Sequence, residues 1–346
     1  MGLYSDIFEQ PAVLRRALET QFQAAQAIAR ELRKRELRYV FLAARGTSDH
    51  AGVYAQYVWG SLNRLPVAFA APSLFTRYGD WPRLDDALVV GISQSGQSSD
   101  VVSVIAEGRR QGAPTLAITN DLTSPLARSA EFTLDIQAGP ETAVAATKTY
   151  TAELLAVAQM AVALHEAPDE HAAALFRVPE AVAAALALDE PARRAAEALG
   201  PAEKCIILGR GYNYATALEW ALKLKELAYV MADPYAAPDF KHGPIALVEP
   251  GFPVLAVAPA GAVAADVIEL LRHLRDNLGA ELLVISDDEA ALAAGQRGLR
   301  LPGGVPEWLT PLVAIVPAQL YCYHLTRARG FDTEAPRYLK KVTETR

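Results

Sequence analysis

The sequence contains little cysteine, and this shortage argues against two kinds of site. Its 346 residues include two cysteines, Cys205 and Cys322, each inside an apolar run. Neither belongs to a CxxC or CxxH spacing, and the six histidines show no ligand spacing, so we expect no metal site. Two cysteines also give no support for a disulfide framework. We therefore expect two buried free thiols.

Positive charge is scarce as well. The chain has 33 Lys and Arg against 40 Asp and Glu, which gives a formal net charge of −7. An acidic chain has no overall attraction to nucleic acid or to anionic lipid. We expect neither nucleic acid nor a membrane as a partner, and any phosphorylated ligand must be held by a local pocket.

A long uninterrupted hydrophobic run is also missing. The first residues, MGLYSDIFEQP, contain Asp6 and Glu9 and lack the basic and apolar regions of a signal peptide. The longest apolar stretch, residues 154–164, is rich in alanine and too short to span a bilayer. The sequence therefore predicts a packed helix at 154–164 and a cytoplasmic protein.

Strand-length apolar runs alternate with helix-length amphipathic segments in the first half of the chain. The runs at residues 39–44, 87–93 and 115–119 are each followed by a segment of helical periodicity. Such alternation indicates a parallel sheet with helices on both faces. The predicted fold class is α/β, in the three-layer arrangement of flavodoxin-like or Rossmann-like domains.

The same pattern occurs a second time. KCIILGRG at 204–211 repeats YVFLAARG at 39–46, and PVLAVAPAG at 253–261 repeats the run that ends in ISQSG at Gly96. The spacing between the two copies is the same for both motifs, which indicates a duplicated α/β fold. We place the parts of the chain as an N-terminal helical segment (1–35), a first domain (36–180), a second domain (181–335) and a tail (336–346).

The turn after the second predicted strand is rich in hydroxyl groups. It reads Ser93, Gln94, Ser95, Gly96, Gln97, Ser98, Ser99, whereas the corresponding turn of the second copy, residues 258–262, has none. A helix N-terminus offers unpaired N–H groups and a partial positive charge, which suits a phosphate monoester. A plain serine-capped helix is the alternative, but four hydroxyl residues within seven exceed what capping needs.

The turn after the first strand occupies the equivalent place. It carries Thr47 and Ser48, at the edge of the sheet where open α/β folds bind ligands. These two hydroxyls are therefore candidates for the same ligand, although a capped turn explains them equally well.

The second copy supplies candidates for acid–base chemistry. Glu219 and Lys223 are spaced as i,i+4 partners, which indicates a solvated surface pair. Glu226 has apolar neighbours, and a partly dry pocket would raise the pKa of its carboxyl towards that of a general base, although a structural role fits the periodicity better. His242 precedes Gly243 in PDFKHGP, a segment that we expect to be neither regular helix nor central strand, and suits acid–base chemistry near neutral pH.

Six ordered motifs, RGTSDHAG, ISQSGQSSD, AGPETAVAATKTYTAEL, ALEWALKLKELAYV, AAPDFKHGP and PRYLKKVT, resemble the tandem sugar isomerase (SIS) domains of glucosamine-6-phosphate synthase. The resemblance implies a phosphate site at Ser93, Gln94, Ser95 and Ser98, with Thr47 and Ser48 nearby. It implies that Val144 and Lys223 line the sugar pocket, that Glu226 moves the proton between C1 and C2, that His242 opens the sugar ring, and that Lys341 reaches the sugar.

The resemblance further implies a homodimer with composite sites, a sugar phosphate as ligand, and no metal or organic cofactor. The glutaminase domain of the synthase has no counterpart, so we do not expect ammonia to be made from glutamine. Arg45 stands where the synthase has cysteine and Ala146 where it has serine, which resembles stand-alone amino-sugar-phosphate deaminases.

The predicted activity is conversion of glucosamine 6-phosphate, or a close hexosamine 6-phosphate, to fructose 6-phosphate and ammonia through an enolamine. A phosphosugar isomerase or a fructosamine-phosphate deglycase is the alternative within enzymes. A non-catalytic sugar-phosphate sensor is the alternative outside them.

Overall fold

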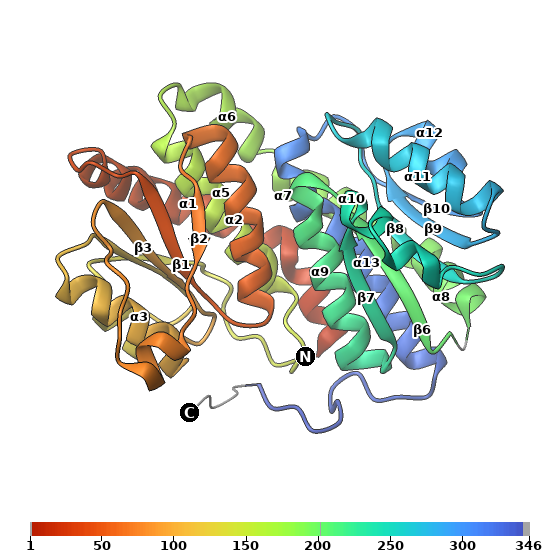
Figure 1. Ribbon diagram of the computed structural model, residues 1–346, viewed down its shortest axis with the longest axis horizontal. Coiled ribbons are helices and arrows are strands. Elements are labelled where there is room, and N and C mark those ends of the chain that lie inside the picture. The colour runs from red at the N-terminus through yellow and green to blue at the C-terminus, as the bar shows by residue number, and fades with distance from the viewer. Residues whose placement is uncertain (1, 201, 342–346) are drawn as a thin grey trace. The chain divides into compact units, whose positions relative to one another are not determined.

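The computed structural model describes residues 2–200 and 202–341, which form two compact units (Figure 1). We call residues 10–141, 148–177 and 340–341 the N-terminal unit. We call residues 2–9, 142–147 and 178–339, apart from residue 201, the C-terminal unit. The first helix, α1 (Leu3–Leu32), begins in the C-terminal unit and continues in the N-terminal one.

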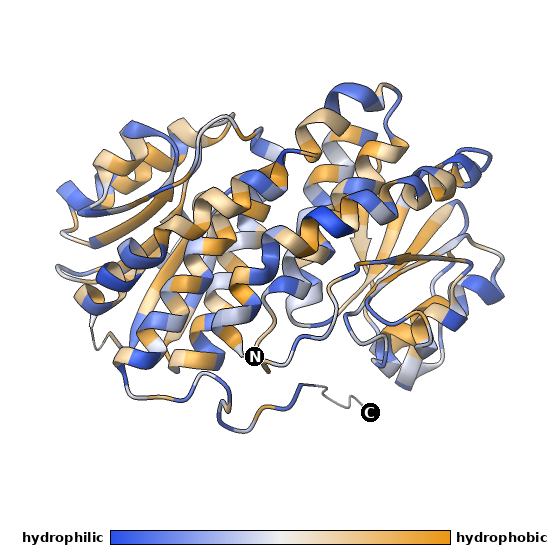
Figure 2. Cartoon of the chain, turned by 180° about the vertical axis from the view of Figure 1, so that it is seen from behind, coloured by the Kyte–Doolittle hydropathy of each residue, from blue (hydrophilic) through white to orange (hydrophobic). Residues whose placement is uncertain are grey.

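The N-terminal unit is built on a five-stranded parallel sheet in the order β2-β1-β3-β4-β5. Its strands are β1 (Tyr39–Ala43), β2 (Val67–Phe69), β3 (Ala87–Ile92), β4 (Thr115–Thr119) and β5 (Phe132–Asp135). The central strands β3 and β4 are buried along their whole length, as expected of a sheet covered on both faces. In Figure 2 these strands are mostly orange, whereas the covering helices alternate orange and blue.

Helices cover both faces of this sheet. One face packs against α3 (Ser99–Arg110), α4 (Pro125–Ser129) and the π-helical turn η1 (Leu74–Tyr78). The other side carries α2 (Thr47–Asn63) and α5 (Lys148–Leu164), which pack on each other, and the short α6 (Pro168–Leu175) packs against α5. The packed helix predicted at 154–164 is confirmed, because α5 is buried from Lys148 to Ala163.

The C-terminal unit repeats this topology. Its strands are β6 (Lys204–Gly209), β7 (Met231–Ala236), β8 (Pro253–Val257), β9 (Glu281–Ser286) and β10 (Arg297–Arg300). They are parallel in the order β10-β9-β8-β6-β7, which is the order of the first sheet read from the other end. The predicted α/β class and the duplicated fold are therefore confirmed.

Helices also cover the second sheet on both faces. One face packs against α10 (Ala237–Lys241), α11 (Ala264–Asp276) and α12 (Glu289–Ala294). The other elements are α9 (Tyr214–Lys223), the π-helical turn η4 (Leu224–Ala228) and α13 (Thr310–Ala328), with the 3-10 turns η3 (Gly211–Asn213), η5 (Pro244–Leu247) and η6 (Glu307–Leu309). Cys205 and Cys322 are free and buried, as predicted.

One stretch of the described residues, Pro168–Leu199, is long and apolar enough to cross a membrane by length and composition, with a mean hydropathy of 1.3. The structure divides it into α6, α7 (Val178–Ala185), the 3-10 turn η2 (Leu186–Leu188) and α8 (Asp189–Leu199). A helix that spans a bilayer bonds its backbone groups internally along its length. This stretch is interrupted instead, and its pieces α7 and α8 pack on α13.

Candidate functional site

The hydroxyl-rich loop lies in the N-terminal unit, where β3 ends and α3 begins. Gly96 makes its tight turn possible, because its φ of +60° is a left-handed conformation that side chains disfavour. A Cβ at this position would also lie 2.1 Å from Ser124 Oγ. The loop is tied to the neighbouring strand end through Asn120 N, which donates to Gln94 O at 3.0 Å. Glycine at position 96 is therefore required by the shape of the loop.

The N-cap serine of this loop does not cap the helix with its side chain. Ser98 is the N-cap residue of α3, but its side chain makes no capping hydrogen bond. Its Oγ is buried and has no hydrogen-bond partner among the described residues. Ser95 Oγ accepts only a long bond within the loop, from Gln97 N at 3.3 Å. Because buried hydroxyls are normally paired, helix capping does not account for the Ser98 hydroxyl.

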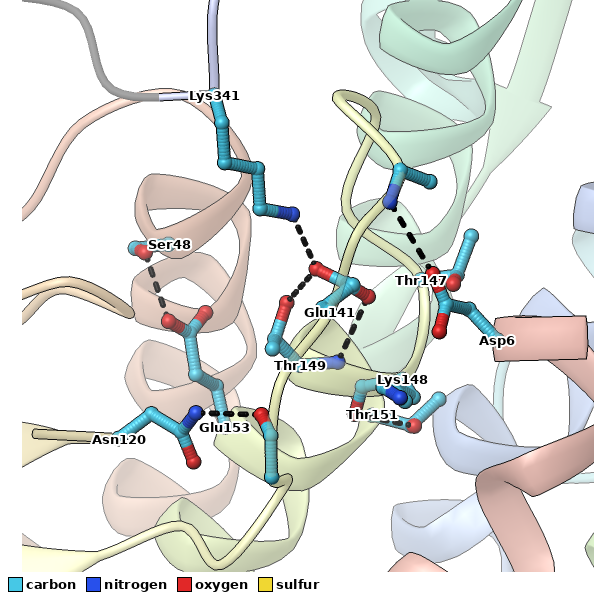
Figure 3. Close-up of polar contacts among 12 residues, drawn as sticks. Asp6, Ser48, Asn120, Glu141, Thr147, Lys148, Thr149, Thr151, Glu153 and Lys341 are labelled. Atoms are coloured by element: carbon cyan, nitrogen blue, oxygen red, sulfur yellow. Dashed lines mark hydrogen bonds and ion pairs between the residues drawn. The ribbon is translucent and has the colours of Figure 1, made fainter. Parts of the chain in front are cut away.

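The turn after β1 brings Thr47 and Ser48 to the first turn of α2, at the same edge of the sheet. Gly46 precedes them with a φ of +56°. The hydroxyl of Ser48 is buried and donates to Glu153 Oε1 of α5 at 2.8 Å, as Figure 3 shows. Ser48 therefore supports the site from within the unit, and half-buried Thr47 is the more accessible of the two.

Lys341 is held against the N-terminal unit by a buried carboxylate. Its Nζ lies 2.6 Å from Glu141 Oε2, whose side chain is fully buried (Figure 3). The same carboxylate accepts from Thr149 Oγ1 at 2.6 Å and from Thr149 N at 3.3 Å, at the start of α5. The tail lysine is thus placed by an interaction that the sequence pattern did not reveal.

In the second copy, carboxylate side chains accept hydrogen bonds from the loop that corresponds to the hydroxyl-rich turn. Ala262 N donates to Glu307 Oε2 at 2.9 Å, and Ala260 N donates to Asp287 Oδ1 at 2.8 Å. The two carboxylates occupy loop amides that an anionic ligand would otherwise use. The two copies therefore differ at this loop: the described second-copy amides Ala260 N and Ala262 N bond carboxylates, and the first copy carries serines there.

Three charged residues of the C-terminal unit lie in a row on one face of α9 and η4, two of them buried and the third, Glu226, half-buried. Lys223 Nζ lies 2.6 Å from Glu226 Oε2 and 3.3 Å from Glu219 Oε1. The side chains of Lys223 and Glu219 are 2% and 0% exposed, so the predicted solvated surface pair is wrong. An i,i+4 spacing gives the same pattern on a buried face as on an exposed one, and packing against α13 decided the outcome here.

The surroundings of Glu226 suit a proton acceptor. Its side chain is 23% exposed, and it lies on η4, a π-helical turn of the kind often found at functional sites. Burial lowers the pKa of Lys223, but the charges of Glu219 and Glu226 outweigh burial and raise it above its ordinary value. The Lys223 ammonium therefore stays charged beside the Glu226 carboxylate.

His242 and Val144 also belong to the C-terminal unit. His242 is exposed and follows directly on α10, before Gly243 with its φ of +144°. The expectation that PDFKHGP contains no helix is wrong for its first residues, because Pro238 fits the first turn of α10, where no N–H is needed. Val144 is half-buried in the segment 142–147, in which Ala143 N donates to Asp6 Oδ2 at 3.3 Å.

Each unit thus gathers one part of the predicted chemistry. The loop serines, Thr47, Ser48 and Lys341 belong to the N-terminal unit, and Val144, Lys223, Glu226 and His242 to the C-terminal one. Sequence reasoning missed the supporting carboxylates Glu141, Glu153 and Glu307, because their partners are distant in the sequence. No group of three His, Cys, Asp or Glu side chains that could hold a metal ion occurs among residues 2–200 and 202–341.

Known proteins are similar to this chain in sequence and in fold. The SIS domain family matches the chain twice, at residues 32–163 and 198–328. Glutamine–fructose-6-phosphate aminotransferase of Thermococcus kodakarensis is 35% identical over 349 residues, and the match covers 98% of this chain and 57% of that protein. The chain therefore spans little more than half the length of this relative.

Solved structures agree with these matches. A protein of Silicibacter pomeroyi, provisionally described as a phosphosugar isomerase, superposes with a TM-score of 0.86 at 36% identity, covering 96% of this chain and 99% of that one. The C-terminal domain of glucosamine-fructose-6-phosphate aminotransferase from Francisella tularensis gives a TM-score of 0.87 at 28% identity, covering 96% and 98%.

A more distant structure shares the fold alone. Glucosamine-6-phosphate deaminase of Thermotoga maritima has a TM-score of 0.77 at 20% identity, with 99% of both chains covered. The resemblance found in the sequence motifs is confirmed: the chain belongs to the SIS domain family, carries two such domains in tandem, and is homologous to the corresponding domains of the aminotransferase.

Proposed function

We propose that this protein is a phosphosugar isomerase of the SIS family that acts on a hexosamine 6-phosphate, and that it converts glucosamine 6-phosphate to fructose 6-phosphate and ammonia. The observation that carries the proposal is the half-buried carboxylate of Glu226, 2.6 Å from the buried ammonium of Lys223. It supplies a charged base on one copy of the fold, while the other copy keeps the hydroxyl-rich loop.

The proposal assigns the phosphate to the first copy. Ser93, Gln94, Ser95 and Ser98 would hold it with side-chain groups and with the amides at the start of α3, and Thr47 would lie beside them. The buried, unpartnered Ser98 Oγ supports this role. The loop amides of the second copy are bonded by Glu307 and Asp287, which supports a single phosphate site in the chain.

The chemistry is assigned to residues of the second copy. His242 would help to open the sugar ring, which exposes an aldehyde at C1. Glu226 would remove the proton from C2 and return it to C1, so that the enolamine becomes an imine at C2. Water then adds to the imine, and ammonia leaves as the C2 ketone of fructose 6-phosphate forms. Lys341, as a positively charged group, would stabilise the enol oxygen.

The position of His242 supports a further part of the proposal, a homodimer with composite sites. This histidine and its neighbours Lys241 and Gly243 are exposed, so the loop is available to a second copy of the chain. If Glu226 and His242 act from different subunits, mixing Glu226→Gln and His242→Asn proteins restores about a quarter of the activity. Sites built within one chain would leave the mixture inactive.

The activity is tested directly. The protein is incubated with glucosamine 6-phosphate, galactosamine 6-phosphate and N-acetylglucosamine 6-phosphate, and ammonia and ketose phosphate are measured. We expect both products in equal amounts from an amino sugar. Glucose 6-phosphate is tested in parallel, and its conversion to a ketose phosphate, with no ammonia from any amino sugar, would make the protein an aldose–ketose isomerase. A ligand-induced thermal shift without any turnover would favour a sensor.

The base is tested by proton exchange. Glu226→Gln is expected to slow exchange of the C2 proton with deuterium by about 10²–10⁴-fold while ligand binding stays nearly unchanged. Glu269→Gln, an exposed substitution on α11, is the matched control and keeps the wild-type exchange rate. Wild-type exchange in Glu226→Gln would show that another group is the base.

A further inference from the structure

Arg45 is the positively charged residue of the RGTSD turn, and the proposed function gives it no role. Its side chain reaches from the end of β1 to the first turn of α3. Nη2 and Nε donate to the same oxygen, Oδ2 of Asp100, at 2.6 and 3.0 Å. The Asp100 side chain is 8% exposed, whereas that of Arg45 is 51% exposed. The guanidinium is thus held by Asp100 through Nε and Nη2, on a side chain that is half exposed to solvent.

The sheet places this guanidinium beside the hydroxyl-rich loop. β1 and β3 are parallel neighbours, with Ala43 opposite Gly91, so the turn after β1 and the loop after β3 leave the sheet at the same edge. Asp100, which holds Arg45, lies two residues after Ser98 in the same helix. The Arg45–Asp100 pair therefore joins the two turns that the proposed function assigns to phosphate.

The charges at this edge explain why an arginine is needed. Ser93–Ser98 contains no positive side chain. Asp100 lies in the first turn of α3 and Asp49 in the first turn of α2. Burial raises the pKa of Asp49, and the charges of His50 and Arg45 oppose that rise. Without a cation, a phosphate dianion would meet carboxylates at both helix starts and be repelled.

We propose that Arg45 is a phosphate-binding residue of this site and that Asp100 is the positioning residue that orients its guanidinium. This inference rests on the proposed function, because it names a further group that recognises the phosphate of the same substrate. Guanidinium groups are well suited to this role, since they present several N–H donors in one plane and bind phosphate oxygens in pairs.

The test measures binding without turnover. Glucitol 6-phosphate, an open-chain sugar phosphate that has no carbonyl, is titrated by calorimetry into wild-type protein, Arg45→Ala, Asp100→Asn and the double variant. We expect Arg45→Ala to weaken binding by about 10–100-fold, the worth of one or two charged hydrogen bonds. Arg109→Ala, an exposed arginine at the other end of α3, is the control and leaves the affinity unchanged.

The double variant separates direct contact from simple neutralisation of charge. It removes the unpaired Asp100 charge, so it also guards against a folding defect in Arg45→Ala. If Arg45 touches the phosphate, Arg45→Ala/Asp100→Asn still binds at least tenfold more weakly than the wild type, although the repulsion by Asp100 is gone. Recovery to within threefold of the wild type would overturn the contact, because Arg45 would then only neutralise Asp100.

The remaining outcomes distinguish this inference from the proposed function. Wild-type protein that fails to bind glucitol 6-phosphate would overturn both. Wild-type protein that binds it, with unchanged affinity in Arg45→Ala, would overturn the role of Arg45 and leave the phosphate site in place. Asp100→Asn alone is expected to weaken binding by less than Arg45→Ala does, since the guanidinium remains and loses only its orientation. A larger loss in Asp100→Asn would contradict the assignment of roles.

Discussion

Replacing Lys223 with methionine should destabilise the C-terminal unit strongly, because two carboxylates lose their shared partner. Glu226 Oε2 and Glu219 Oε1 lie 2.6 and 3.3 Å from Lys223 Nζ. At an effective dielectric constant of about 20, each contact is worth roughly 5–6 kcal/mol of attraction, most of which offsets the cost of burying the charges. Removing one member of a buried pair typically costs about 3–5 kcal/mol, and we expect a loss of that size.

The assay is urea unfolding followed by tryptophan fluorescence, to which the buried Trp220 of α9 contributes. Lys225→Met is the matched control, because Lys225 lies two residues away and is exposed, so its loss should change the free energy of unfolding by less than about 0.5 kcal/mol. Adding Glu219→Gln to Lys223→Met should recover at least about 1 kcal/mol, since it neutralises a buried carboxylate that has lost its neighbouring ammonium.

The pH dependence follows from the same row of charges. The two carboxylates hold the pKa of Lys223 above its ordinary value of 10.5. A raised folded-state pKa gives stability that is complete below the unfolded value and is lost as the pH rises above it. The wild-type advantage over Lys223→Met should therefore be constant up to about pH 10 and shrink above it. If Lys223→Met lowers the free energy of unfolding by less than about 1 kcal/mol, or by no more than Lys225→Met does, Lys223 is not the buried partner of the two glutamates.

Three further predictions concern the loop, the tail and the thiols. Gly96→Ala should lower the free energy of unfolding by about 2–5 kcal/mol, because a left-handed backbone strains alanine and its Cβ would overlap Ser124. Gly112→Ala, at a φ of +81° with open space around it, should lower it by about 1–2 kcal/mol. Both are measured by urea unfolding, and equal losses would contradict the role of Ser124. Glu141→Gln and Lys341→Met should each destabilise the protein, because Lys341 Nζ lies 2.6 Å from Glu141 Oε2. A double-mutant cycle should give a coupling energy of about 0.5–3 kcal/mol between the two substitutions. Additive losses would show that this ion pair contributes nothing to stability. Burial raises the pKa of Cys205 from 9.0 to about 12, so the thiol should not react with a colorimetric reagent at pH 8 until urea unfolds the chain. The contribution of Cys205 to stability should fall as the pH rises above 9, because the thiol of the unfolded chain then loses its proton first. Rapid reaction of both cysteines in the native protein would contradict their burial.

Much of this protein was determined by local sequence patterns. The alternation of apolar runs and amphipathic segments predicted the parallel strands, because side chains buried on both faces of a sheet must be apolar along the whole strand. The repeat of that alternation predicted the second sheet. The hydroxyl-rich turn and Gly96 were visible in the letters, since a strand, a glycine and a helix start in that order allow few conformations.

Only the tertiary structure decided how charged side chains were used. The spacing of Glu219 and Lys223 is the same on a solvated helix as on a buried one, and packing against α13 made this pair a buried one. Asp100, Glu141 and Glu307 found their partners 55, 200 and 45 residues away, across turns that no local pattern connects. Electrostatic energy depends on distance in space and on burial, and both are set by the packing of whole elements, which a single stretch of sequence does not contain.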